Sequence, residues 1–153
     1  MRKVYRISKC AYIDDLKGTG AAQFGGRWHS KGTHILYTAS SPALALLESV
    51  VHIATIPMVD YCMICLEIPD DKILKINITE LPDNWYFNPA PNGLAIIGDN
   101  FIRRNEYLAI EIPSVIIAEE NNILLNPNYK DFSKVKISYK RKIPIDPRFF
   151  ART

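Results

Sequence analysis

Residues 32–59 carry a single formally charged side chain, that of Glu48. A segment this apolar folds either as a membrane span or inside a globular domain. Pro42, Glu48, His52 and Pro57 interrupt it before the roughly 20 consecutive apolar residues of a membrane span are reached. The segment therefore predicts a strand followed by a buried helix, and no membrane association is expected.

Glu48 is unexpected in this segment, because burying an unpaired carboxylate costs free energy. We therefore expect it to have a partner or a function. At helical spacing, Ser41, Ala45, Ser49 and His52 share its sector, while large apolar side chains cover the remainder. We expect a mostly buried helix with one narrow polar window. That window faces either bulk water or a cleft in which Glu48 holds a ligand hydroxyl or stabilises positive charge.

The secondary structure predicted along the chain is mainly β. Ser41 is a good N-cap with Pro42 at the first helical position, so a helix is predicted from there to residue 54. Segments 61–68 and 72–78 are expected to pair as a hairpin across Pro69 and two aspartates. A second helix is expected over residues 93–104. Further strands are predicted over residues 4–7, 34–38, 107–113, 115–118 and 135–143.

This pattern predicts the α+β class: a single compact domain, residues 1–153, with a mixed β-sheet and few helices. The 48% hydrophobic content excludes a disordered chain, and the net charge of +3 names no partner. Cys10, Cys62 and Cys65 are odd in number and have no framework spacing, so Cys62 and Cys65 are expected to be core thiols. Without a hydrophobic signal segment after Met1, a cytoplasmic location is expected.

A glycine pair precedes the second candidate group, Arg27 and Trp28. Backbone N–H groups at Gly25 and Gly26 can turn towards an anion, and Arg27 can bind a phosphate with its guanidinium fork. Trp28 can stack on a base or close the core. The alternative is an ordinary Gly-Gly turn anchored by a buried tryptophan. No dinucleotide fingerprint or Walker A sequence is present.

Three further polar residues lie on predicted strands. Arg6 is either an exposed edge residue or an anion ligand, while Tyr37 and Ser114 are most simply core hydroxyls bonded to the backbone.

Glu48 and His52 lack a third ligand and Cys62 and Cys65 lack a second pair, so no metal is expected. A row of lysines marks either a protected edge strand or a phosphate-binding face: Lys134, Lys136, Lys140 and Lys142.

Seven short motifs lie in order over nearly the whole chain: Val4-Tyr5-Arg6-Ile7, Gly25-Gly26-Arg27-Trp28, Leu36-Tyr37-Thr38-Ala39, Ala43-Leu44-Ala45-Leu46-Leu47-Glu48, Ile112-Pro113-Ser114, Asn122-Ile123-Leu124-Leu125-Asn126-Pro127 and Asp146-Pro147-Arg148. Together they resemble the RES-domain family of bacterial toxins, which are paired with helix-turn-helix antitoxins. His29 and Ile123 depart from the usual Asn and Tyr of that family.

The resemblance implies a fold similar to ADP-ribosyltransferases and an enzyme that cleaves NAD at its nicotinamide-ribose bond. NAD is then a substrate and no cofactor is required. Carried over by position, Arg6 and Arg27 grip pyrophosphate or ribose, Tyr37 packs against nicotinamide or ribose, Glu48 serves the reacting ribose, and Ser114 completes the pocket. The implied partner is a helix-turn-helix antitoxin protein.

Two alternatives stay open at this point. The first is an ADP-ribosyltransferase that modifies a protein or tRNA. The second is a nucleic-acid-binding or nuclease toxin that uses the lysine row, although direct nucleic-acid binding is not expected without an aromatic RNA motif or a His-based nuclease pair. The sequence leaves a homo-oligomer open as well.

Overall fold

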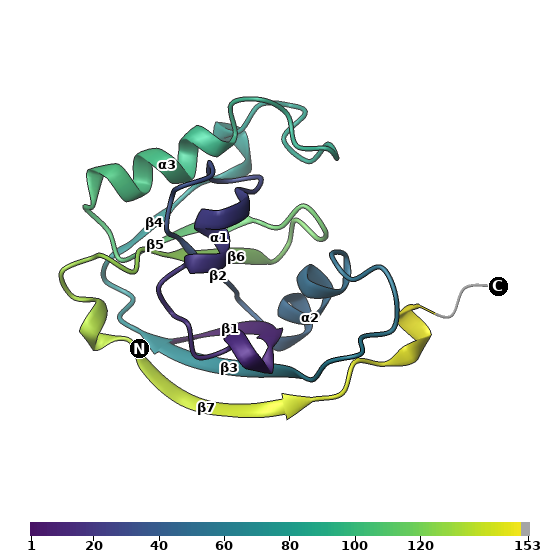
Figure 1. The fold of residues 1–153 in the computed structure, drawn as a ribbon. Coiled ribbons are helices and arrows are strands. Elements are labelled where there is room, and N and C mark those ends of the chain that lie inside the picture. Colours follow the sequence, from purple (N-terminus) through teal and green to yellow (C-terminus); the bar gives the residue numbers. More distant parts are fainter. Residues whose placement is uncertain (151–153) are drawn as a thin grey trace.

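One curved sheet of seven strands organises the chain, in the order β4-β5-β6-β2-β1-β3-β7 (Figure 1). The computed structural model describes residues 1–150. Neighbouring strands are antiparallel except for β4 and β5, so the sheet is mixed and the predicted α+β class is confirmed. The strands are β1 (Arg2–Lys9), β2 (Leu36–Ala39), β3 (Tyr61–Ile68), β4 (Ile73–Lys75), β5 (Ala109–Pro113), β6 (Asn121–Leu125) and β7 (Lys136–Ile143).

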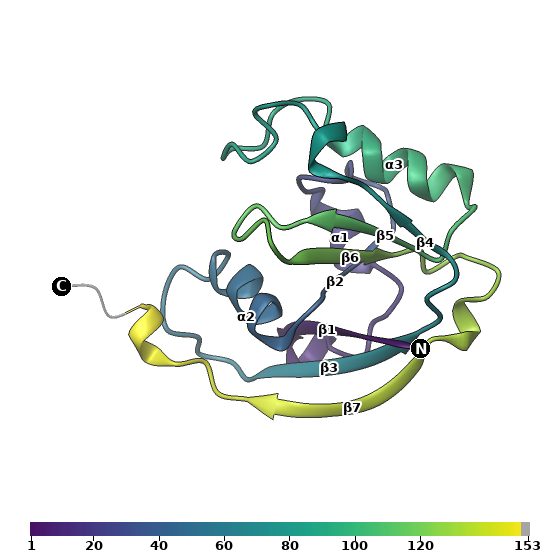
Figure 2. The same cartoon turned by 180° about the vertical axis from the view of Figure 1, so that it is seen from behind.

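Three α-helices accompany the sheet: α1 (Thr19–Phe24), α2 (Pro42–Val50) and α3 (Ala95–Arg104). Short 3-10 turns follow at η1 (Cys10–Tyr12), η2 (Ile78–Glu80), η3 (Phe132–Lys134) and η4 (Pro147–Phe149). Seen from the front and from behind, α2, the turn at residues 114–120 and the segment at residues 82–92 lie at one end of the molecule (Figures 1 and 2). That end carries the residues described in the next subsection.

Helix α2 begins as predicted, with the Ser41 hydroxyl accepting the backbone N–H of Leu44. It ends four residues earlier than predicted, at Val50, because the chain continues in tighter turns in which His52 and Ile53 donate to carbonyls three residues back. The expectation of a mostly buried helix is wrong. Only Leu44 and Ala45 are buried within α2, which packs one face on β1 and β2 and leaves the other open.

The predicted hairpin between segments 61–68 and 72–78 is wrong. Both edges of β3 are occupied, one by β1 and the other by β7. The chain therefore crosses to the far end of the sheet, where β4 pairs in parallel with β5. Local turn composition does not reveal such competition between strands that are distant in sequence.

The strand predicted over residues 115–118 is also wrong, because a turn occupies these residues and the strand is β6. Ser114 causes the turn: its hydroxyl accepts the N–H of Ile116 at 3.0 Å, and its own N–H donates to the Glu120 carbonyl at 2.9 Å. A side-chain acceptor of this kind competes with strand pairing. The chain reverses and returns as β6 beside β5.

Cys10 and Cys62 form a disulfide between the start of η1 and β3. The prediction of two core thiols is thus correct for Cys65, which is buried and free, and wrong for Cys62. Strand pairing supplies the reason. Ser8 lies opposite Cys62 in the β1-β3 register, so Cys10, just past the end of β1, comes beside a residue 52 positions away in sequence.

We expect Cys10→Ser to lower the free energy of unfolding by about 4 kcal/mol, because the bond closes a loop with a sequence separation of 52. Urea unfolding without reductant measures the difference. Wild type treated with dithiothreitol is the matched control and should unfold at the same urea concentration as the variant. Equal midpoints for oxidised wild type, reduced wild type and variant would contradict the cross-link.

The lysine row follows an edge strand, as one of its two predicted readings requires. β7 ends the sheet, and its residues are exposed except for Ile143. Three of the four lysines form surface ion pairs: Lys134 with Asp131, Lys140 with Asp14 and Lys142 with Asp60. These carboxylates reduce the positive field that a phosphate backbone would meet. Within residues 1–150, no helix has the length and apolar character to cross a membrane.

Candidate active site

The carboxylate of Glu48 extends from α2 to the ends of two central strands. The Ser114 hydroxyl, directly after β5, donates to Glu48 Oε1 at 2.8 Å, and Asn122 Nδ2 on β6 donates to the same oxygen at 2.9 Å. Oε2 has no hydrogen-bond partner among residues 1–150. The polar window of α2 therefore faces the sheet, with one carboxylate oxygen held and the other left to accept from a ligand.

Ser114 orients this carboxylate with a hydroxyl whose own direction is fixed. Because the Ser114 oxygen accepts the backbone N–H of Ile116, its hydrogen is directed at Glu48. Ser114 is fully buried and Asn122 nearly so, which keeps both donors in place. The simplest prediction from the sequence was a hydroxyl bonded to the backbone. Ser114 makes such a bond, and it also donates to the Glu48 side chain.

Arg27 lies beyond α1 with its guanidinium partly buried. Nη1 donates to the backbone carbonyls of Trp85 at 2.9 Å and Phe87 at 2.8 Å, and both of its hydrogens are thereby used. Nε and Nη2 have no protein partner in the described part of the chain. Burial lowers the pKa of Arg27, while the Glu48 carboxylate acts in the opposite direction. Arg27 thus lies within the field of Glu48 and keeps two groups free for an anion.

The glycine pair makes room for a hydrogen-bonded Tyr37. Gly25 adopts a φ of 70°, which favours glycine. A Cβ on Gly26 would lie 2.9 Å from the His29 ring and 3.3 Å from the Tyr37 hydroxyl. His29 Nε2 lies 2.7 Å from the Ala21 carbonyl, which can only accept, so Nε2 donates to it, and Nδ1 lies 2.6 Å from the Tyr37 hydroxyl. Burial raises the pKa of Tyr37, which keeps it a neutral donor.

Trp28 lies in the core rather than in the opening of the site. Its side chain is 2% exposed and its ring centroid is 6.4 Å from that of Trp85. On the other side, its backbone carbonyl lies against Gly98 of α3, where a Cβ would come within 1.9 Å. Of the two sequence readings, the structure favours the one in which Trp28 closes the core.

Arg6 is not brought together with these groups. Its strand, β1, is paired on both sides, so Arg6 is not an edge residue. The register aligns Tyr5 with Ala39 and Ala39 with Asn122, which puts Tyr5 on the face of the site and Arg6 on the other face. Arg6 Nη1 donates to the carbonyl of Ile13 at 3.0 Å. Its role towards NAD stays a prediction that the sequence resemblance carries.

Comparison with known proteins identifies the family of the chain. The RES domain matches residues 3–147. The chain belongs to the RES domain family. It is 35% identical over 141 residues to Toxin Res of Photorhabdus laumondii, with 90% of each chain covered. It is 36% identical over 144 residues to the Prs ADP-ribosylating toxin of Sphingobium sp., with 91% of this chain and 89% of the relative covered.

The fold of this RES-domain toxin is also found in a solved structure. The structure of the M. tuberculosis MbcT-MbcA toxin-antitoxin complex matches with a TM-score of 0.75, covering 97% of this chain and 86% of that chain. At 15% sequence identity the likeness shows the fold alone. The fold is thus shared with a chain of that complex whose sequence differs widely from this one.

Two residues of the candidate site were not singled out from the sequence. Asn122 was noted only within a motif, although a buried amide in an apolar strand is a signal, because it needs a partner. Trp85 and the segment around it gave no signal, since their link to Arg27 runs through backbone carbonyls. Such contacts do not depend on the identity of the side chain.

A cavity of about 320 Å³ lies elsewhere, between α3 and strands β4 and β5, with Phe101, Tyr107 and Ile110 among its lining residues. Glu48 and Arg27 do not line it. The candidate site of this RES toxin therefore rests on hydrogen bonds and charge, not on an enclosed cavity. Within residues 1–150, no three His, Cys, Asp or Glu side chains gather as a metal site would require.

Proposed function

We propose that this RES-domain toxin cleaves NAD between nicotinamide and ribose, with Glu48 as the residue that serves the reacting ribose. One observation carries the proposal: a single carboxylate is held through Oε1 by two buried donors, while Oε2 has no partner among residues 1–150. Membership of the RES family supports it independently.

The chemistry fits one carboxylate better than a pair. Cleavage of an N-glycosidic bond passes through an oxocarbenium-like state, so a fixed negative charge near the ribose stabilises charge that develops only there. Nicotinamide leaves as a neutral molecule and needs no strong general acid. A glycosidase, in contrast, uses two carboxylates because its leaving oxygen must be protonated.

Other residues take positions consistent with binding the rest of the dinucleotide. Arg27 offers Nε and Nη2 to the pyrophosphate, and Tyr37 offers its ring to the nicotinamide riboside, because its hydroxyl is bonded to His29. Ser114 and Asn122 act through Glu48 as positioning residues. Gly25 and Gly26 allow the packing behind Tyr37.

The test is to incubate the purified protein with NAD and follow free nicotinamide by liquid chromatography, with and without inorganic phosphate. We expect nicotinamide in at least one condition. ADP-ribose as the second product indicates hydrolysis, and a phosphorylated ADP-ribose indicates transfer to phosphate. A wild-type protein that releases no nicotinamide in any condition, including with cell extract as acceptor, would refute the proposal.

A second candidate keeps the same bond cleavage but sends ADP-ribose to a macromolecule. The Sphingobium relative, named an ADP-ribosylating toxin, is the observation that favours it. NAD labelled in its adenine distinguishes the two, because the label enters protein or RNA only if a macromolecule is the acceptor. Free labelled product alone would support NAD degradation.

A toxin that consumes NAD needs restraint, and we propose an antitoxin protein as the partner. The matching solved structure comes from a toxin-antitoxin complex, which supports an antitoxin partner. A partner that covers the end of the molecule with α2 and residues 82–92 would block the site (Figure 2).

A further inference from the structure

Two adjacent aromatic side chains, Tyr86 and Phe87, lie on the surface just before α3. Their exposed fractions are 56% and 52%, and their rings meet edge to face with centroids 5.2 Å apart. Core packing does not explain them, because half of each ring is in solvent. Exposed neighbouring aromatic rings of this kind are typical of binding surfaces.

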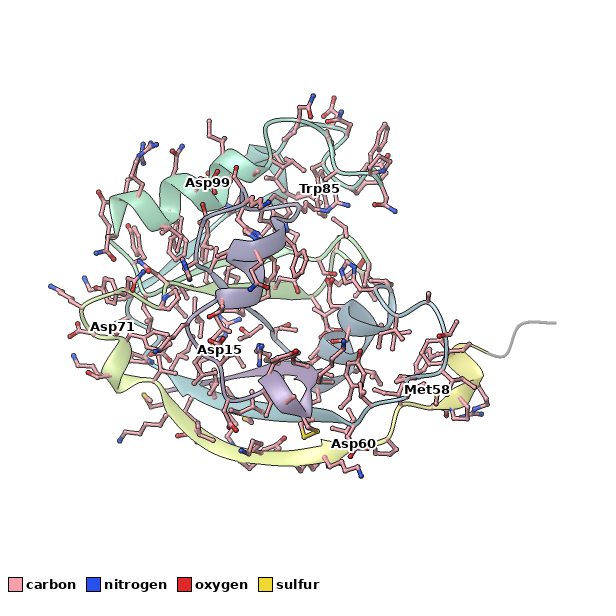
Figure 3. The ribbon with its side chains drawn as sticks, viewed as in Figure 1. Asp15, Met58, Asp60, Asp71, Trp85 and Asp99 are labelled. Carbon is pink, nitrogen blue, oxygen red and sulfur yellow. A yellow bond between two sulfur atoms is a disulfide. The ribbon has the colours of Figure 1, made fainter. Side chains whose placement is uncertain are left out.

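The backbone that carries the aromatic pair is held firmly. The neighbouring Trp85 is buried and packs against Trp28, and Figure 3 shows it on the segment beside α3. Arg27 Nη1 binds the carbonyls on either side of Tyr86, those of residues 85 and 87. A further backbone bond, from the Phe87 N–H to the Asn84 carbonyl, closes a turn at 3.0 Å. The two rings are thus presented on an ordered segment.

The same arginine connects this segment with the site. The charge of Glu48 acts on the pKa of Arg27, and Arg27 contacts the aromatic segment through Nη1, while Nε and Nη2 have no partner among residues 1–150. One arginine is therefore bonded to the backbone of residues 85 and 87 and lies within the electrostatic influence of Glu48. In both ribbon views the segment and α2 lie at the same end of the molecule.

We propose that Tyr86 and Phe87 bind the adenine base of NAD by stacking. This inference rests on the proposed function and extends it to the part of the substrate that does not react. In a dinucleotide the pyrophosphate lies between the two nucleosides. Nicotinamide ribose at Glu48, pyrophosphate at Arg27 and adenine at the aromatic pair follow that order, and Arg27 is bonded to the backbone that carries the pair. Base stacking on aromatic side chains adds affinity without a general requirement for hydrogen bonds to the base.

The experiment compares wild type with Tyr86→Ala/Phe87→Ala, using nicotinamide release from NAD. We expect KM for NAD to rise about tenfold or more with kcat little changed, since stacking contributes about 1–3 kcal/mol per base. ADP-ribose, which carries adenine, should become a weaker competitive inhibitor by a similar factor. Nicotinamide mononucleotide, which lacks adenine, should compete equally well with both proteins.

The matched control is Tyr139→Ala, which removes an exposed aromatic ring from β7 at the edge of the sheet and should leave all these constants unchanged. An unchanged KM for NAD in the double variant would overturn the adenine site, as would an equal loss of affinity for nicotinamide mononucleotide. Failure of the proposed function is distinct: wild type itself would then release no nicotinamide.

Discussion

Glu48→Gln should lower kcat for nicotinamide release by about 100- to 1,000-fold, the usual effect of removing one electrostatic stabiliser from a transition state. The amide oxygen of glutamine can still accept from Ser114 and Asn122, so the side chain keeps its position. What is lost is the negative charge, which matters most when positive charge develops on the ribose. KM should therefore change much less than kcat.

Two measurements separate this effect from damage to the fold. Circular dichroism and the urea midpoint of Glu48→Gln should match wild type, because both hydrogen bonds to the side chain survive. Ser114→Ala serves as a comparison: it removes one donor but keeps the charge, so we expect a smaller fall in kcat. If Glu48→Gln is as active as wild type, Glu48 has no part in the reaction, and the proposed mechanism is wrong even if NAD is cleaved.

Local signals in the sequence identified most elements of the fold. Ser41 and Pro42 located the start of α2 because capping is a property of a few consecutive residues. Strand pairing was less accessible: the predicted hairpin failed because β1 and β7 compete for the edges of β3. The disulfide was missed for the same reason, since Cys10 meets Cys62 only through the β1-β3 register.

The candidate site likewise contains residues that local sequence signals identified and contacts that depend on the fold. Glu48 was singled out because a lone carboxylate in an apolar segment is visible in the sequence, and the structure gives it two partners. The contact between Arg27 and residues 85 and 87 could not be predicted from the sequence, because it uses backbone carbonyls that every residue has. Arg6 lies on the other face of β1, so its role towards NAD stays a prediction that rests on the sequence resemblance.

Gly98→Ala should destabilise the protein by about 1–3 kcal/mol or more, the usual result of overpacking. Helix propensity alone predicts the opposite sign, because alanine is favoured over glycine by about 1 kcal/mol within a helix. Packing decides here: the new Cβ would lie 1.9 Å from the Trp28 carbonyl oxygen, and a backbone atom cannot move aside as a flexible side chain can. Urea unfolding of the variant against wild type measures the change.

Gly20→Ala is the matched control, because Gly20 also lies in a helix and a Cβ there would meet nothing within 4 Å. It should leave stability unchanged or raise it slightly. The Gly98 variant should also bind NAD more weakly, since α3 would push on Trp28, which packs under Trp85 and follows Arg27 in the chain. A Gly98→Ala protein at least as stable as Gly20→Ala would mean that α3 does not approach the Trp28 backbone this closely. The packing described here for Arg27 and the aromatic pair would then be wrong.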